Sequence, residues 1–482
     1  MSALDYSLLI IVLGLTLYMA FFFGKRHKNT NDYFLAGRRI PWLVACLSLM
    51  ATEISILTVM AVAASSFRED WSALQYFIGS AAARVCVTYF FIPVFYQTPG
   101  TTIYEYLRRR FGEKTRYAAA GFFFLFRFPA SAVRLTAAAA AIGQLMGWPM
   151  NSMLLILVLL ALLYVGYGGV EAAAWAGVMQ TLVVAAAAAA TLAFICGRVD
   201  GGLEGIWDIS LETGKLQFFN SSALPAVISG FFVALAAIGA DHEMMQKLFI
   251  VKDRRESQKA VLFSIPGSFL ILILFLSIGT GLFAFYRVNT GMSLPARFEN
   301  IYPHFTATVM PALLRGLILT AFVLSVIDLP LTSMGAVFLT DLYRPLRPDR
   351  DTDRGSSEIT ELNLARALSV IFALILGALA YFFIARGRFL WLAFQIGGVA
   401  FGPLLGIFLL GLFTRVKADK ANAVAMSAIG GLNAILLYLS QIGLLPFSWN
   451  WLVVIGTAGT FVTARWLAPQ FEGELSKAGK AS

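Results

Sequence analysis

The chain has 482 residues and a formal charge of +10; 59% of its residues are hydrophobic, only 13% are charged, and the mean hydropathy is +0.76. This composition excludes a soluble globular protein and a disordered one. The positive charge does not indicate a nucleic-acid partner, because the basic residues fall in short loops between apolar runs.

The first apolar run, residues 5–24, is predicted to be an uncleaved helix and not a signal peptide. No basic residue precedes it, and Lys25, Arg26 and Lys28 follow it. This order predicts an extra N-terminal helix whose N-terminus lies outside the cell.

Thirteen apolar runs have about the 20 residues that a membrane-spanning helix needs. They are 5–24, 41–67, 71–97, 117–146, 150–167, 170–197, 223–249, 260–286, 315–341, 361–385, 389–414, 421–443 and 448–468. The cysteines Cys46, Cys86 and Cys196 lie inside these runs, so they predict neither disulfides nor a metal site. The longest stretches between runs, 198–222 and 287–314, are expected to form short helices on the outer face.

The charges of the loops support this count. Loops predicted on the inner side carry basic clusters such as those at 108–110 and 254–255, whereas outer loops carry isolated bases such as Arg198 and Arg287. One span more or fewer in the middle would remove the asymmetry. The chain is therefore predicted to be an all-α integral membrane protein, with one transmembrane domain over 1–482 and a cytoplasmic tail over 469–482.

Five charged residues lie near the middle of predicted spans: Glu53, Arg84, Arg127, Arg134 and Asp328. Each would cost at least ~2.5 kcal/mol if it faced lipid, so these side chains must face protein or water. A shared polar cavity is the simplest explanation. The alternative is a set of structural ion pairs that fix helix packing.

The mid-membrane arginines suggest an anionic solute, because a guanidinium can bind a carboxylate through two parallel hydrogen bonds. Arg127 and Arg134 are seven residues apart and share a helix face. Arg127 lies nearer the inner interface and could instead extend toward it. Arg84 completes an i, i+4, i+8 stripe with Tyr76 and Ser80.

The stretch "ATEIS", residues 51–55, places an acid and two hydroxyls in the middle of a span. Hydroxyl and carbonyl oxygens bind small hard cations, and a helix interrupted at mid-depth frees carbonyls for that purpose. The alternative is that Ser and Thr bond back to their own helix.

Several motifs, in order, resemble the sodium:solute symporter family, which includes proline, pantothenate, sugar, sialic acid and monocarboxylate transporters. They are "NDYFLAGRRIPWLVACLSLMATEIS", "FFIPVFYQTPGTTIYEYLRRRFG", "VEAAAWAGVMQTL", "DHEMMQKLFIVKD" and "GPLLGIFLLGLFTRVKADKANA". The resemblance covers nearly the whole chain.

The resemblance implies a LeuT-like fold, an inverted repeat of five plus five helices. The first repeat would be 41–197 (core helices one to five) and the second 223–414 (core helices six to ten). One extra helix, 5–24, precedes them and two follow in 421–468, which agrees with the thirteen spans. Core helices one and six would be interrupted, and Gly230 and Gly239 are compatible with an interruption in the second.

The resemblance also implies a sodium site between core helices one and eight. The matching carbonyls are those of Ala51, Ile54 and Phe322, and the matching hydroxyl is that of Ser325. Two departures stand out: Val326 replaces a second serine, and Gly177 replaces an aspartate that some members use. Asp328 stands where such members have a hydroxyl, so it is a further candidate sodium ligand, a proton carrier, or a partner of an arginine.

For the solute, the family's pocket positions match Glu53, Thr58, Tyr76 and Ser80. Charge and depth add Arg84 and Arg134. The expected function is sodium-coupled symport of a small organic anion, such as a carboxylate or sialic acid, by alternating access. The alternatives are a proton-coupled symporter, a carrier of sugars or other neutral solutes, and a membrane receptor without transport.

Enzymatic activity is not expected, because the three histidines, His27, His242 and His304, are far apart in the sequence. Sodium is the expected coupling ion, and no organic cofactor is expected. The expected partners are the solute, sodium and membrane lipid, with no nucleic acid. The expected protein is a monomer in the bacterial inner membrane, with its C-terminus in the cytoplasm.

Overall fold

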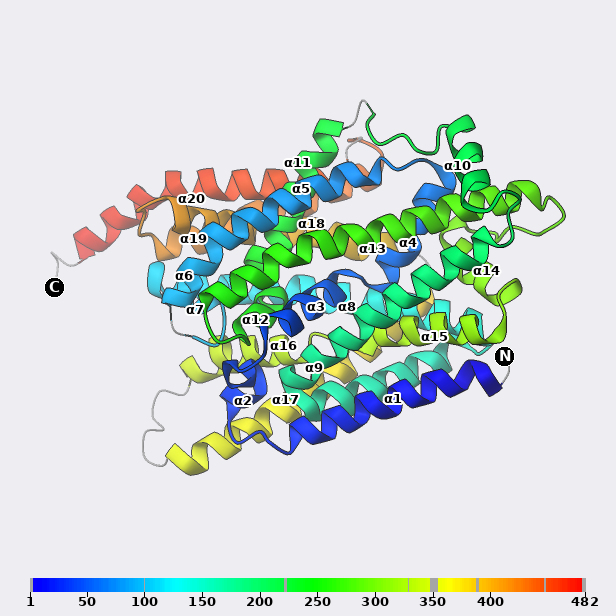
Figure 1. Ribbon diagram of the computed structural model, residues 1–482. Helices are drawn as coiled ribbons and strands as arrows, with labels where there is room; N and C mark the ends of the chain where they lie inside the picture. The colour runs from blue at the N-terminus through cyan, green and yellow to red at the C-terminus, as the bar shows by residue number, and fades with distance from the viewer. Residues whose placement is uncertain are drawn as a thin grey trace.

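The computed structural model describes residues 3–98, 100–220, 223–327, 329–346, 354–386, 390–445 and 448–478. These residues are mostly helical, and their only β contact is an isolated bridge between Ile40 and Val251. Most of the long helices run side by side in one bundle, with the two termini at opposite ends (Figure 1). The all-α membrane fold predicted from composition is confirmed.

Within the described residues, eleven helices are long and apolar enough to cross a membrane, or twelve if one bent pair counts as a span. The helices that form these spans are α1 (Ala3–Gly24), α5 (Ala73–Cys86) with α6 (Ile92–Gln97), α8 (Glu113–Met146), α9 (Met150–Cys196), α11 (Ala223–Leu235), α13 (Arg254–Val288), α15 (Ala312–Ile327), α17 (Arg354–Arg386), α18 (Leu390–Phe413), α19 (Asp419–Gln441) and α20 (Asn450–Ala478). The bent pair is α3 (Trp42–Glu53) and α4 (Ile56–Arg68).

Helix α9 contains two of the predicted spans. Its 47 residues would reach about 70 Å if straight, more than twice the hydrocarbon thickness of a bilayer. The backbone leaves the helical conformation at Gly169, where φ is 62° and ψ is −164°. A side chain there would also collide with His27 and Tyr33. Both the positive φ and the lack of space therefore favour glycine at this position. The count of thirteen depends on α9 crossing twice and stays a prediction.

Two helices are interrupted where the family resemblance implied. The axes of α3 and α4 differ by 62° across the break at residues 54–55. Helix α11 passes through a wider π-helical turn, η3 (Ala236–Ala240), and ends at Asp241, where α12 (His242–Phe249) begins. Gly239 lies in this turn, but Gly230 does not mark a break: a Cβ on Gly230 would approach the Tyr76 carbonyl to 2.1 Å, so this glycine allows α11 to pack closely on α5.

The remaining elements of the fold are short helices. The short helices expected in 198–222 and 287–314 are present as α10 (Gly202–Glu212) and α14 (Ile301–Thr308), and their place on the outer face stays a prediction. The others are α2 (Thr30–Leu35), α7 (Tyr104–Arg110) and α16 (Leu331–Val337), and α1 packs along α9 and α15. The first interrupted helix packs mainly against α9 and α13, and the first half of the second packs mainly against α5.

Candidate ion and solute site

Local hydrogen bonds replace the helix ladder at the break between α3 and α4. Ser55 caps α4, its Oγ accepting from the Thr58 amide at 3.3 Å. The Thr58 hydroxyl donates to the Glu53 carbonyl at 3.0 Å, and the Thr52 hydroxyl donates to the Ser48 carbonyl at 3.0 Å. The alternative that these hydroxyls bond back to their own helix is therefore found for Thr52, Ser55 and Thr58, and the candidate cation ligands at the break are its carbonyls.

The two carbonyls named for sodium share a single side-chain partner, Gln180 of α9. The Gln180 Nε2 atom donates to the Ala51 oxygen at 2.9 Å and to the Ile54 oxygen at 3.1 Å. Gln180 is only 2% exposed, so its amino group is buried at this break. Sequence reasoning missed Gln180, although a lone amide in an apolar span is itself a signal of a polar site.

The place of the missing aspartate is closed by packing. A Cβ on Gly177 would lie 2.7 Å from the Ser48 Cα and 2.9 Å from its Oγ. Any side chain at this position would therefore force α9 away from α3. Gln180 lies three residues after Gly177 on the same helix, about one turn further along. In place of an aspartate at 177, α9 therefore presents the Gln180 amide to the break.

Phe322 and Ser325 lie on α15, both nearly buried. The Ser325 hydroxyl donates to the Phe322 carbonyl at 2.8 Å, which leaves its oxygen lone pairs available to a cation. A narrow, mostly apolar cavity joins Ser325 to Val59 of α4 and Val184 of α9. No hydrogen bond among the described residues joins Ser325 to the Ala51 or Ile54 carbonyl. Asp328, the fifth candidate ligand, lies outside the described residues.

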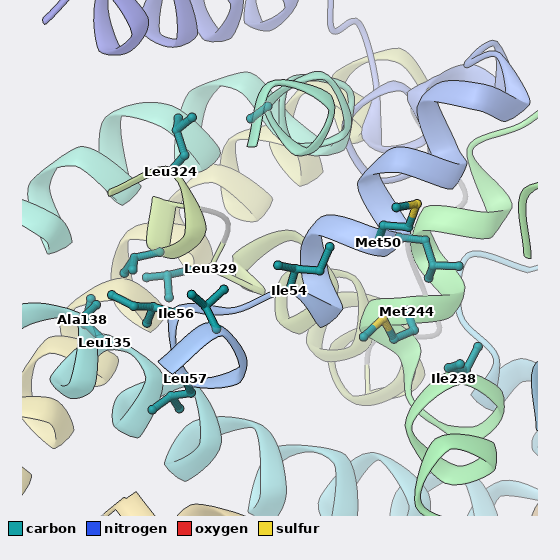
Figure 2. Close-up of a cluster of buried hydrophobic side chains, with 14 of the residues drawn as sticks. Met50, Ile54, Ile56, Leu57, Leu135, Ala138, Ile238, Met244, Leu324 and Leu329 are labelled. Carbon is teal, nitrogen blue, oxygen red and sulfur yellow. The ribbon is translucent and has the colours of Figure 1, made fainter. Parts of the chain in front are cut away.

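Apolar side chains surround the break (Figure 2). Ile54 and Ile56 flank it, with Leu329 and Leu324 close by. Leu135 of α8 belongs to the same buried cluster. A cation held by the carbonyls in such surroundings would interact strongly with them, since the local dielectric constant is low.

The solute candidates on α5 fall into two groups. Arg84, 2% exposed, forms an ion pair with Glu53, and Ser268 of α13 donates to the same carboxylate oxygen at 3.3 Å. Tyr76 lies within electrostatic reach of Glu53. No side-chain hydrogen bond among the described residues links Tyr76 or Ser80 to the other candidates.

The arginines of α8 meet the second interrupted helix. Arg127 forms ion pairs with Asp241 and Glu243 at the start of α12, and all three side chains are at most 4% exposed. Arg127 is thus buried, and the alternative that it extends to the inner interface is wrong. Arg134, 18% exposed, lies 3.9 Å from Glu243. Asp241 and Glu243 were not predicted to be site residues; they stand directly after the break, in the motif "DHEMMQKLFIVKD".

A small cavity of about 30 Å³ adjoins the first break. Glu53 and Thr58 line it, together with Ser268 of α13 and Phe77 of α5. Of the solute candidates, only Glu53 and Thr58 line this cavity. Phe77 and Ser268 were not predicted from the sequence, and their contribution depends on how α5 and α13 pack against the break.

Comparison with known proteins gives consistent results. Residues 33–431 match the family model described as the sodium:solute symporter family. The sodium/sialic acid symporter NanT of Aliivibrio fischeri is 29% identical, covering 98% of this chain and 95% of that protein. The sodium/sialic acid symporter SiaT of Proteus mirabilis is also 29% identical, with 97% and 95% coverage. A solved structure of a Na+-coupled sialic acid symporter, in a substrate-bound outward-open state, is 26% identical, covers 98% of both chains and superposes with a TM-score of 0.85.

Proposed function

The chain belongs to the sodium:solute symporter family, and we propose that it is a secondary active transporter that couples sodium entry to uptake of a small organic anion. The observation that carries this proposal is the helix break at residues 54–55, where two backbone carbonyls lack helical partners and face a single polar side chain. Two sodium/sialic acid symporters, which match this chain over almost their whole length, support the same assignment.

The proposed ion site consists of the Ala51, Ile54 and Phe322 carbonyls and the Ser325 hydroxyl, with Asp328 as a further ligand. We add Gln180. Its amino group bridges the Ala51 and Ile54 carbonyls, and rotation of the amide would bring its oxygen to the same place. Sodium would then take the place of the Gln180 amino group beside the Ala51 and Ile54 carbonyl oxygens, which already lie close together.

Coupling follows from the adjacency of the two sites. The Ile54 carbonyl belongs to the ion site, while the side chain of its neighbour Glu53 lines the cavity. Thr58, which also lines the cavity, hydrogen-bonds to the Glu53 backbone. An ion that fixes the break therefore fixes the cavity wall, and by linkage each ligand raises the affinity for the other by the same factor.

The second half of the second interrupted helix, α12, is packed against the rest of the protein. Every residue of α12 is buried. Lys247 donates to the Thr52 hydroxyl at 2.5 Å, and Gln246 donates to the Phe34 carbonyl at 2.9 Å. We propose that repeats 41–197 and 223–414 exchange outer for inner access, and that release to the cytoplasm separates contacts of this kind.

We place the protein in the bacterial inner membrane as a multi-pass monomer, with its N-terminus outside and its C-terminus in the cytoplasm. Glu53, Thr58, Tyr76, Ser80, Arg84 and Arg134 stay the proposed solute residues. Because Arg84 is committed to Glu53 and Arg127 to Asp241 and Glu243, Arg134 is the arginine whose charge is least neutralised. It is therefore our choice for the solute carboxylate.

Proton coupling is the second candidate, favoured by Val326 in place of a serine and by the acid at 328. Proteoliposomes loaded without sodium would be given an inward gradient of sodium or of protons and tested with radiolabelled sialic acid, lactate and glucose. We expect uptake with the sodium gradient and a weakened sodium dependence in Ser325→Ala. Uptake driven equally well by protons without sodium would contradict the proposal.

A further inference from the structure

Helix α10 presents three different faces around its axis. Residues four apart lie on the same face of an α-helix, because each residue is turned by roughly 100° from the one before. Ile206 and Ser210, at most 5% exposed, form the face that packs on the protein. The second face is apolar and the third acidic, and they consist of Leu203, Trp207 and Leu211, and of Glu204, Asp208 and Glu212.

The apolar face of α10 is left uncovered by the described part of the chain. Leu203, Trp207 and Leu211 are 65%, 54% and 57% exposed. On the helix they lie between the buried face and the acidic face. An amphipathic helix with one apolar and one charged side lies in the plane of a membrane surface, with its apolar side toward the acyl chains.

The contacts of α10 place it where membrane spans end. A Cβ on Gly281 of α13 would lie 3.7 Å from the side chain of Ile206 and 3.1 Å from that of Ile195, next to the last residue of α9. Lys215, three residues after α10, donates to the Phe67 carbonyl at 2.7 Å, next to the last residue of α4. Figure 1 shows α10 at the same end of the bundle as the N-terminus. It therefore lies at the level of the bilayer boundary.

A lipid surface fits the apolar face better than a second protein does. Tryptophan, here Trp207, is enriched at membrane boundaries, where its ring contacts acyl chains and its N–H stays near water. Three side chains offer roughly a few hundred Å², whereas a stable protein interface buries about 800 Å² on each partner.

The charge of α10 restricts the kind of lipid. The helix carries three acidic residues and no basic one. A surface of anionic headgroups would repel it over about one Debye length, whereas a surface of zwitterionic headgroups carries no net charge.

We propose that α10 lies in the boundary of a zwitterionic lipid bilayer, with Leu203, Trp207 and Leu211 inserted among the acyl chains. Glu204, Asp208 and Glu212 then face water. The partner of this surface is the membrane and neither a soluble protein nor a second copy of the chain.

The test measures the depth of each face with nitroxide labels. Cysteines would be introduced one at a time at the six exposed positions, and at Ile206 as the protein-facing control, after Cys46, Cys86 and Cys196 are changed to alanine. In phosphatidylcholine vesicles, labels on the apolar face should collide mainly with oxygen, which concentrates in the bilayer, and lie about 5–10 Å below the headgroup boundary. Labels on the acidic face should collide mainly with a water-soluble nickel chelate.

Two results would overturn the proposal. Nickel accessibility that is equally high on both faces would show that the apolar face lies in water. Low accessibility to both reagents on the apolar face, as expected at Ile206, would show that protein covers it, which in these vesicles means a second copy.

A second measurement uses the natural cysteines and does not depend on the cysteine-free background. Trp207 is one of nine tryptophans, so its emission is the difference between wild type and Trp207→Phe. This emission should be quenched by phosphatidylcholine brominated near the headgroup and should resist aqueous iodide. Quenching by iodide without quenching by bromine would overturn the proposal.

The choice of a zwitterionic surface is tested by changing only the lipid. In phosphatidylglycerol vesicles at low ionic strength, the labels at positions 203, 207 and 211 should lie nearer to water than in phosphatidylcholine. Equal depth in the two lipids would overturn this part of the proposal.

Discussion

The side-chain nitrogen of Gln180 lies 2.9 Å from the carbonyl oxygen of Ala51, although 129 residues separate the two in the chain. The same nitrogen reaches the Ile54 carbonyl. One buried amide thus fastens α9 to the interruption of α3, at the oxygens proposed to bind sodium. Sodium bound at these oxygens, as proposed, would therefore change the contact between these two helices.

Gln180→Leu should weaken sodium binding by about 10- to 100-fold, the range found when a partner of metal ligands is removed. Binding would be measured as the rise in Tm with sodium chloride, using choline chloride to hold ionic strength constant. Thr181→Val is the matched control, since the Thr181 hydroxyl joins α9 to the Leu47 carbonyl at 2.9 Å without touching the proposed ion site. An unchanged sodium midpoint in Gln180→Leu would remove this residue from the site.

Val326→Ser should strengthen sodium binding. Val326 is 1% exposed and directly follows Ser325 on α15. A second hydroxyl there adds a ligand, and a gain of up to tenfold in affinity corresponds to about 1.4 kcal/mol. Val326→Ala loses similar volume without adding a hydroxyl, so it controls for packing. Equal sodium midpoints in the two variants would show that position 326 does not face the ion.

Arg134 is expected to bind the solute carboxylate. Arg134→Lys keeps the charge but loses the planar donor pair, so it should bind weakly; Arg134→Ala should lose about 2–5 kcal/mol, or roughly 30- to several-thousand-fold in affinity. Calorimetry on purified protein would measure this once a solute is identified.

The competing role for Arg134 is to neutralise an acid of the protein. The nearest described acid is Glu243, at 3.9 Å, while Glu53 is paired with Arg84. The diagnostic double variant is therefore Arg134→Ala with Glu243→Gln. Unchanged solute affinity in Arg134→Ala, together with stability restored by Glu243→Gln, would show that Arg134 is structural.

Arg127→Met should strongly destabilise the protein. It leaves Asp241 and Glu243 buried without their shared cation, and breaking a buried pair from one side typically costs about 3–5 kcal/mol. Thermal unfolding in detergent would measure the loss, and adding Asp241→Asn should recover part of it. Arg108→Met is the contrasting control: Arg108 is 38% exposed and pairs with Glu105, so the cost should stay below about 1 kcal/mol. Similar losses in both variants would contradict the structural importance of the Arg127 cluster.

Stability should fall with acid because of His27, in the loop between α1 and α2. Burial, reinforced by the positive charge of Arg366, lowers the pKa of His27 to about 4 from its ordinary 6.5. The unfolded chain therefore takes up this proton at a higher pH than the folded protein does. As a result, the contribution of neutral His27 to the free energy of unfolding is complete above about pH 6.5 and is lost as the pH falls toward 4. The free energy of unfolding should fall by about 2–3 kcal/mol over this pH range, and His27→Phe should abolish this fall. A Tm that varies with pH in the same way in wild type and His27→Phe would contradict this assignment.

The positions of the spans could be read from the sequence because they depend on local properties. Runs of apolar residues and the bias of basic residues toward inner loops act segment by segment. The break in "ATEIS" was implied by the family resemblance, and the hydrogen bonds that replace the helix ladder there lie within a few residues. The number of crossings was harder to establish, because Gly169 divides a continuous apolar stretch with a single turn.

The sequence by itself determined that the protein is a helical membrane protein and that five charged residues lie in mid-span. The tertiary structure decided which partners the described charges have: Arg84 meets Glu53, and Arg127 meets Asp241 and Glu243. It also decided that the uncharged Gln180 meets the broken helix. Hydropathy fixes how deep a residue lies, but the partner it reaches depends on how neighbouring helices are rotated and packed. That rotation is set by side chains distributed over the whole chain, such as the glycines at 177 and 230 that let helices approach closely, and it is not visible in any one segment.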